Sequence, residues 1–166
     1  LPMNALLAVG AVHQKLVKLG KRSDANIIIT SYSARDTHQI ACLIGFGATA
    51  VYPSLAYQTI LDLTSRNELK GDPHENCFRY RKGVNKGLLK IISKMGISTI
   101  SSYRGSQLFE IVGLGEDIVD LCFTNTTSRV KGKNFKNLDK EIRALDDYAR
   151  SNLSDMNVGG LLKYVH

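Results

Sequence analysis

Two short apolar runs, each followed by a helical pattern, constrain the fold of this chain most. The first run, residues 26–30, is rich in isoleucine, and the second, residues 48–52, carries alanine, valine and tyrosine. Apolar residues at helical spacing follow each run, up to Ile44 after the first and up to Leu63 after the second. Because parallel strands need a helix-sized connection, this alternation favours a parallel sheet. We therefore expect an α/β fold.

The same kind of pattern continues along the rest of the chain. Residues 97–101 resemble a third strand, and the polar, glycine-containing residues 66–73 and 124–136 are typical of loops. We therefore expect parallel β-strands that alternate with helices in a layered α/β/α arrangement, followed by a mainly helical C-terminal extension. Helices are expected at residues 3–19, 33–44, 53–63, 74–95, 106–112, 116–122 and 137–152.

Local signals mark several helix ends. Gly20 and Gly96 follow apolar helical patterns and are typical of helix C-termini. Ser33, with Asp36 three residues later, resembles a capping box that opens a helix. Asn137 is a suitable N-cap for the last helix.

Two expectations concern burial. Residues 26–30 are apolar on both faces, which is typical of a strand buried on both sides of a parallel sheet. On the helix at residues 74–95, one apolar stripe is expected to face the core. The stripe comprises Leu88, Leu89, Ile92 and Met95.

Composition limits the class of protein. The chain has 166 residues, is 43% hydrophobic and carries a net charge of +7. A chain of this length can bury an ordinary core without metal or disulfide staples. Its longest apolar runs are far shorter than the roughly 20 residues of a membrane span. The positive charge permits an acidic partner, but it does not indicate a fold.

The sequence contains no motif of a metal or catalytic site. Cys42, Cys77 and Cys122 are odd in number and form no C-x-x-C pair. We expect no catalytic, cofactor-binding or metal-ligating residue here, and the unpaired cysteines favour a reducing, cytoplasmic location. Residues 45–50 read G-x-G-x-x-A, but glycines that follow a helix and precede a strand favour a helix end over a dinucleotide site.

Two similar turns are candidates for an interface or for anion binding. In each, a predicted strand ends in Ser-Tyr and an arginine follows near the start of a helix. If both strands belong to one parallel sheet, both turns lie at its carboxyl edge, where ligands bind and helix N-termini favour anions. The alternative is that these residues only cap helices and form turns. The candidates are Ser31, Tyr32 and Arg35 in the first turn, and Ser102, Tyr103, Arg104 and Gln107 in the second.

Lysines recur every four residues along the helix predicted at residues 74–95. Steps of four on an α-helix drift slowly, so the ammonium groups form one slanting ridge. Like charges at this spacing repel by roughly 0.2–0.5 kcal/mol per pair, which leaves two interpretations, a solvated face or an acidic docking surface. Gly83 and Gly87 on the same helix favour close approach by another backbone. The lysine ridge comprises Lys82, Lys86, Lys90 and Lys94.

A long string of residues resembles a known family. Residues 86–110, KGLLKIISKMGISTISSYRGSQLFE, are closely similar to the large chain of glutamate synthase. The similarity extends through residues 6–13, 34–35, 38, 43–48 and 127–129 and covers most of the chain. Ser33 and Gln39 depart from the pattern of related chains, which weakens a fixed polar role for the first Ser-Tyr turn.

The resemblance implies a segment of a much longer enzyme. Glutamate synthases make two glutamates from glutamine and 2-oxoglutarate with a reductant, and they carry FMN and an iron–sulfur cluster on domains outside this segment. The resemblance implies that residues 1–124 are the C-terminal part of the central α/β domain and that residues 125–166 lead to the FMN-binding domain. It thus implies a non-catalytic scaffold between the glutaminase and FMN domains, with the candidate residues facing an interface or the ammonia tunnel.

Two rival hypotheses stay open at this point. One is a stand-alone anion- or nucleic-acid-binding module that uses the lysine ridge, and the other is a free-standing paralogue with its own ligand site at the strand ends. Both ends of the sequence look cut, which favours a fragment. We then expect as partners the other domains of the same chain and a small reductase subunit, without membrane or nucleic acid, in the cytoplasm or in a plastid. The choice of NADPH, NADH or ferredoxin is not encoded here.

Overall fold

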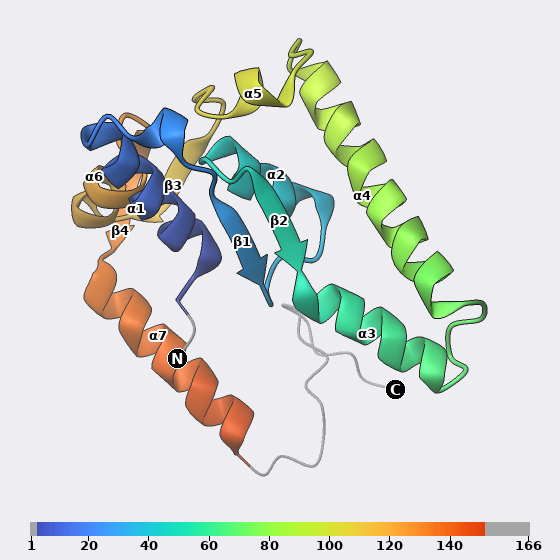
Figure 1. Ribbon diagram of the computed structural model, residues 1–166. Coiled ribbons are helices and arrows are strands. Elements are labelled where there is room, and N and C mark those ends of the chain that lie inside the picture. Colours follow the sequence, from blue (N-terminus) through green and yellow to red (C-terminus); the bar gives the residue numbers. More distant parts are fainter. Residues whose placement is uncertain (1–2, 152–166) are drawn as a thin grey trace.

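The computed structural model describes residues 3–151, and the end of the predicted C-terminal extension, residues 152–166, lies outside them. Helices alternate with short strands (Figure 1), so the expected mixed α/β fold is confirmed. The elements, in chain order, are α1 (Ala5–Lys18), the 3-10 helix η1 (Arg22–Asp24), β1 (Ile28–Ser31), α2 (Thr37–Gly45), β2 (Ala50–Pro53), α3 (Ser54–Ser65), α4 (Pro73–Lys94), α5 (Ile100–Tyr103), β3 (Glu110–Leu114), α6 (Glu116–Cys122), β4 (Thr127–Lys133) and α7 (Phe135–Arg150).

The strands form two small parallel sheets within the described residues. β1 pairs with β2 over Ile28 to Ser31, and α2 is the crossover between them, as the sequence predicts. β3 pairs with β4 through α6, with irregular register around Val112. The first sheet carries the main core, and the second lies beside α1 and α6.

The main core lies between α1, α2, α4 and one face of the β1–β2 sheet. Its buried side chains include Val9 of α1, Leu43 of α2 and Ile92 of α4, and Ile29 and Val51 of the sheet pack against them. A smaller cluster joins β3, α6 and α1. α1 and α6 approach so closely at Gly10 that a Cβ there would overlap the carbonyl oxygen of Cys122.

Two helices begin at other residues than expected. α2 starts at Thr37, because the Asp36 carboxylate accepts from the Gln39 amide (2.8 Å) and the Gln39 side chain accepts from the Asp36 amide (3.3 Å). The capping box predicted at Ser33 is therefore wrong, although α2 itself is confirmed. α7 starts at Phe135 with Asn134 as its N-cap, and Asn137 completes that capping box instead of being the cap.

Three predicted elements between residues 97 and 136 are wrong. Residues 97–101 form an irregular segment and the start of α5, residues 106–112 run into strand β3, and the loop expected at residues 124–136 contains strand β4. Short apolar segments are ambiguous between helix and strand, and here the pairing of β3 with β4 decides. Burial of Ile111 in the smaller cluster fixes the inward side of β3.

The long helix α4 runs almost as predicted, but its buried stripe is narrower. Leu88 and Ile92 are buried against the main core, whereas Leu89 is 65% exposed and Met95 is 51% exposed. Residues 88 and 92 lie one turn apart on one side of the helix, and Leu89 is rotated about 100° from Leu88. The prediction of burial is therefore wrong for Leu89 and Met95.

Substitution of the two α4 glycines, Gly83 and Gly87, by alanine should change the stability of the protein in opposite directions. A Cβ at Gly87 would lie 2.6 Å from the Thr37 hydroxyl oxygen of α2, whereas a Cβ at Gly83 would meet nothing within 4 Å. Both Gly→Ala changes gain helix propensity, up to about 1 kcal/mol. We therefore expect Gly83→Ala to raise the free energy of unfolding and Gly87→Ala to lower it, because overpacking costs about 1–3 kcal/mol. Urea denaturation of the two variants checks this pair, and equal stabilisation of both would contradict the α2–α4 contact.

Candidate functional site

The β1–β2 sheet has one face that no helix covers within the described residues. Side chains of strands alternate between faces, so the inward Ile29 and Val51 leave their neighbours pointing outward. Ile28 is 73% exposed and Tyr52 is 53% exposed. The expectation that this strand is buried on both sides is therefore wrong for the described structure. We call Ile28, Thr30, Ala50 and Tyr52 the open face.

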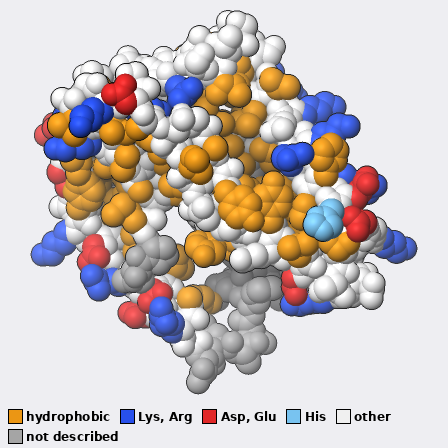
Figure 2. All heavy atoms as spheres, in the orientation of Figure 1, with side chains coloured by type: hydrophobic (Ala, Val, Ile, Leu, Met, Phe, Trp, Pro, Cys, Tyr) orange, Lys and Arg blue, Asp and Glu red, His pale blue; other side chains and the backbone are white. Residues whose placement is uncertain are grey.

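Aromatic residues extend the open face onto α3 and α4. The Tyr52 and Tyr57 rings stack at 5.5 Å between centroids, and Tyr57 meets Tyr80 edge to face at 5.5 Å. Beside them is a hollow of about 550 Å³, which is lined by Tyr52, Tyr57, Leu61, His74, Cys77, Phe78 and Arg81. Hydrophobic side chains gather over β1, β2 and the start of α3 in Figure 2. Tyr, Phe and Arg in an exposed hollow are typical of contact hot spots.

The outer edge of β1 also has no strand partner among the described residues. A groove of about 290 Å³ follows this edge, between α1 (Ala8, Val9, Val12, Leu16) and residues 26–29. An unpaired parallel strand beside an apolar groove presents free backbone N–H and C=O groups. The open face and the open edge are therefore adjacent.

The first predicted turn lies at the carboxyl end of β1, as expected. Ser31 is buried, and its hydroxyl accepts from the Ala34 amide (3.1 Å) and contacts the Ser33 hydroxyl (3.2 Å). Tyr32 is exposed, and the Arg35 carbonyl accepts from the Tyr80 hydroxyl (2.9 Å). The hydrogen bonds of Ser31 are thus those of a turn-forming residue.

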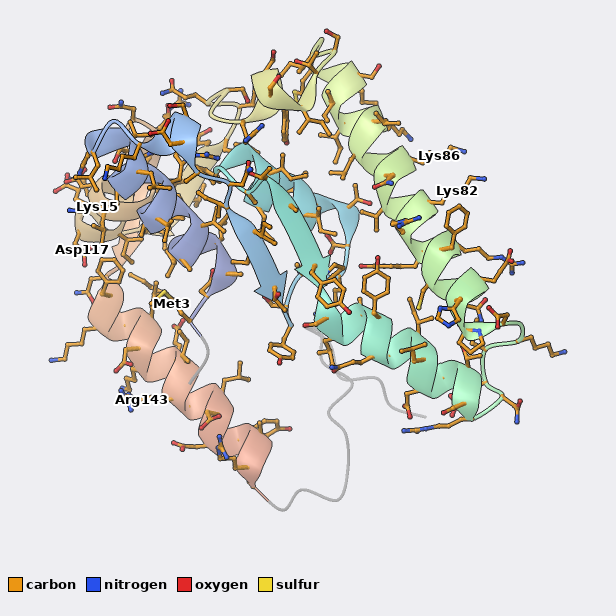
Figure 3. All side chains as sticks on the ribbon, viewed as in Figure 1. Met3, Lys15, Lys82, Lys86, Asp117 and Arg143 are labelled. Atoms are coloured by element: carbon orange, nitrogen blue, oxygen red, sulfur yellow. The ribbon has the colours of Figure 1, made fainter. Side chains whose placement is uncertain are left out.

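A cavity of about 570 Å³ adjoins that turn. Residues 29–33, the first residues of α1 and the Ile142, Leu145 and Ala149 side chains of α7 line it, so it is mostly apolar. Met3 also lines this cavity, whereas Arg143 lies on the outer side of α7 (Figure 3). The arrangement resembles a gap between packed elements more than a polar ligand site.

The second predicted turn lies at the opposite end of the sheet. Gly105 donates its amide to the Gly45 carbonyl at the end of α2 (2.8 Å), and the Arg104 guanidinium reaches Thr49, just before β2. Tyr103 is buried, whereas Ser102 and Gln107 are exposed. The two turns are therefore not neighbours at one carboxyl edge, because residues 97–101 are not a strand of the sheet.

The lysine ridge lies on the outer side of α4. Lys82 and Lys86 project away from the body of the molecule (Figure 3), and all four lysines are exposed. None of them forms an ion pair with another residue in the part of the chain that the structure describes, whereas Arg79 on the same helix pairs with Glu75 at 3.1 Å. The ridge is thus exposed in this segment and separate from the two turns, and its role as a docking surface stays a prediction.

One basic cluster could not be foreseen. His13 of α1, Arg22 of η1 and Arg104 after α5 come together at the amino end of the sheet, although they are distant in sequence. Arg22 Nε donates to His13 Nδ1 at 2.9 Å. Burial lowers the pKa of His13 below its ordinary 6.5, and the charges of Arg22 and Arg104 lower it further. Only the tertiary fold brings these three residues together.

The described residues do not fit an iron–sulfur site. No group of three His, Cys, Asp or Glu side chains is placed to hold a metal ion among residues 3–151, and an iron–sulfur cluster needs several cysteine thiolates. Cys42 Sγ lies 3.7 Å from His38 Nε2, but burial raises the pKa of the Cys42 thiol. At the glycine motif, Phe109 fills the space beside Gly45, so the glycines serve close packing. No helix of the described part is long and apolar enough to cross a membrane.

The fold and these surfaces define an α/β segment whose sheet has one exposed face and one unpaired edge among the described residues. The family described as glutamate synthase central domain matches residues 1–115, and this chain belongs to that family. Over 90% of its length it is 39% identical to the glutamate synthase [NADPH] large chain of Bacillus subtilis, of which it covers 10%. It is 44% identical over 82% of its length to ferredoxin-dependent glutamate synthase 1 of Arabidopsis thaliana, and 35% identical over 87% to glutamate synthase [NADH] of Saccharomyces cerevisiae, covering 9% and 7% of them. The resemblance predicted from residues 86–110 is confirmed.

The His13 cluster predicts a specific pH dependence of stability. Because the pKa of His13 is lowered in the folded state, the unfolded chain takes up the proton first as the pH falls below about 6.5. The stability that neutral His13 contributes is complete above that pH and is lost as the pH falls toward the lowered folded value. We expect His13→Gln to reduce this slope of the free energy of unfolding. Denaturation of both proteins across this range checks it, and parallel curves would contradict it.

Proposed function

We propose that this chain is a structural segment of a glutamate synthase that positions the catalytic domains of the same polypeptide. It spans a tenth or less of the length of the relatives named above. Family membership and the open surfaces support a part that is completed by neighbouring chain. In this proposal residues 1–124 belong to the central α/β domain and residues 125–166 lead toward the FMN-binding domain.

The chemistry of the whole enzyme is part of the proposal. The parent enzyme would convert glutamine, 2-oxoglutarate and a reductant into two glutamates, with FMN and an iron–sulfur cluster held by other domains. The relatives' names specify NADPH, NADH or ferredoxin, so the reductant varies among proteins similar to this segment. The glutaminase and FMN domains of the same chain would be its contacts, with a small reductase subunit of the parent enzyme, in the cytoplasm or a plastid.

The open face is the observation that carries this proposal. Burying one large apolar side chain contributes about 1.5–3 kcal/mol, so Ile28 and Tyr52 together offer several kcal/mol to whatever covers them. Contiguous apolar surface of this kind marks a contact site, and the adjacent free edge of β1 offers backbone hydrogen bonds as well. We propose that the occupant is the remaining part of the parent polypeptide, because nine tenths of each relative lies outside this segment.

The rival hypothesis, a stand-alone anion- or nucleic-acid-binding module that uses the lysine ridge, has no support in the comparisons. Every relative named above is a glutamate synthase. The simplest experiment reads the open reading frame on both sides of this chain. We expect a glutaminase domain upstream and a barrel with clustered cysteines downstream. Stop and start codons close to both ends would contradict the proposal.

A charge on the open face should harm the long polypeptide and spare the isolated chain. Ile28→Asp puts a carboxylate where the proposal places apolar neighbours, so we expect a loss of about 2 kcal/mol or more in the longer polypeptide. In this chain alone Ile28 is already in water, and the loss should be small. Thermal unfolding of both forms checks this.

Leu89→Asp is the matched control, because Leu89 is equally apolar and exposed but lies on α4, outside the open face. It should change neither form by more than about 0.5 kcal/mol. If Ile28→Asp and Leu89→Asp act alike in the longer polypeptide, the open face is not a docking surface.

A further inference from the structure

The basic cluster at the amino end of the sheet is held by one firmly anchored guanidinium. Arg22 Nη1 donates to the Ala25 carbonyl at 2.6 Å, and Nη2 donates to the Gly47 carbonyl at 2.8 Å. With the bond from Nε to His13, Arg22 ties η1 to α1 and to the end of α2. A positive charge is therefore fixed at this point of the fold.

Arg104 adds a second positive charge beside the first. Arg104 lies close enough for its charge to lower the pKa of His13. The pKa of the Arg22 guanidinium is also lowered, mainly by burial and then by the charge of Arg104. Neither arginine pairs with a carboxylate of the described residues. Partly buried charges in folded proteins normally have an opposite charge beside them. Two guanidiniums without an acid thus form an unbalanced site.

Arg104 itself makes a single side-chain hydrogen bond among the described residues. Its Nε is buried and has no acceptor, and its one side-chain bond is a long one, 3.5 Å from Nη1 to Thr49 Oγ1. A buried donor without an acceptor costs about 1–3 kcal/mol, and more when the group is charged. Such groups are rare in native proteins, and where they occur an ion or a water molecule often binds beside them.

We propose that His13, Arg22 and Arg104 form an oxyanion-binding site at the amino end of the β1–β2 sheet. Arg22 supplies a fixed positive charge. Arg104 turns its Nε and Nη2 toward the anion, because these two N–H groups can donate side by side to two oxygens of a carboxylate or phosphate. Because His13 Nδ1 accepts from Arg22, its Nε2 carries the hydrogen and is a further donor. The lysine ridge takes no part.

The oxyanion can come from two sources. It is either a free anion, such as a phosphate or a small carboxylate, or the carboxylate of an Asp or Glu elsewhere in the longer polypeptide. The second source rests on the proposed function, and the first does not. The same donors serve both, so the experiment must distinguish them.

The test follows the His13 ring by NMR during a pH titration of the purified chain. Sulfate is the probe, because it stays doubly charged across the range, and chloride at equal ionic strength is the reference. An anion beside His13 stabilises its protonated form, so we expect sulfate to raise its pKa by about 1, with saturation. The ring signals of His74, which lies across the molecule on α4, should not respond to sulfate.

Variants connect the response to the site. Arg104→Met should abolish the sulfate effect on His13, whereas Lys94→Met, the loss of an equal charge from the ridge, should leave it unchanged. The wild-type titration needs neither variant, so poor folding of one would not remove the test. If sulfate moves His13 no more than His74, or if Arg104→Met keeps the full response, the proposal is wrong.

Repeating the titration on the longer polypeptide identifies the source. If His13 responds to sulfate there as well, the site takes a free oxyanion. If it responds only in this chain, a carboxylate of the polypeptide occupies the site. Either result supports the site, and neither depends on enzymatic activity.

Discussion

One packing contact determines the surfaces of this molecule: the burial of Ile29 and Val51 against α1, α2 and α4. Because successive side chains of a strand point to opposite faces, fixing these two inward places Ile28 and Tyr52 outward. A shift of one residue in register would exchange the two faces. The open face is therefore a direct consequence of the core, which covers only one side of the sheet among the described residues.

The two ends of the same sheet differ in character. At the carboxyl end the polar groups are satisfied internally, with Ser31 held by its own turn. At the amino end two guanidiniums and a neutral histidine meet without an acid among the described residues. Ligands of parallel sheets usually bind at the carboxyl end, but here the amino end has the unpaired charged groups. This difference between the two ends of the sheet fits the proposal that the segment contacts other domains, while the chemistry of the parent enzyme takes place elsewhere.

Sequence reasoning worked where local signals are long and consistent. α1, α3 and α4 have several turns of apolar spacing, and Gly20 and Gly96 take positive φ at the predicted helix ends. It was wrong for β3 and β4, since their pairing with each other outweighs the local pattern of residues 106–136. The His13, Arg22 and Arg104 cluster and the open face depend on tertiary packing, which no spacing in the sequence encodes.

The central claim is that the rest of a longer polypeptide covers the open face. Hydroxyl-radical footprinting measures it directly, because oxidation of Tyr52 reports solvent access to that face, with Leu89 on α4 as an internal reference. We predict strong oxidation of Tyr52 in this chain and marked protection in the longer polypeptide, at unchanged oxidation of Leu89. Equal oxidation of Tyr52 in both would contradict the account.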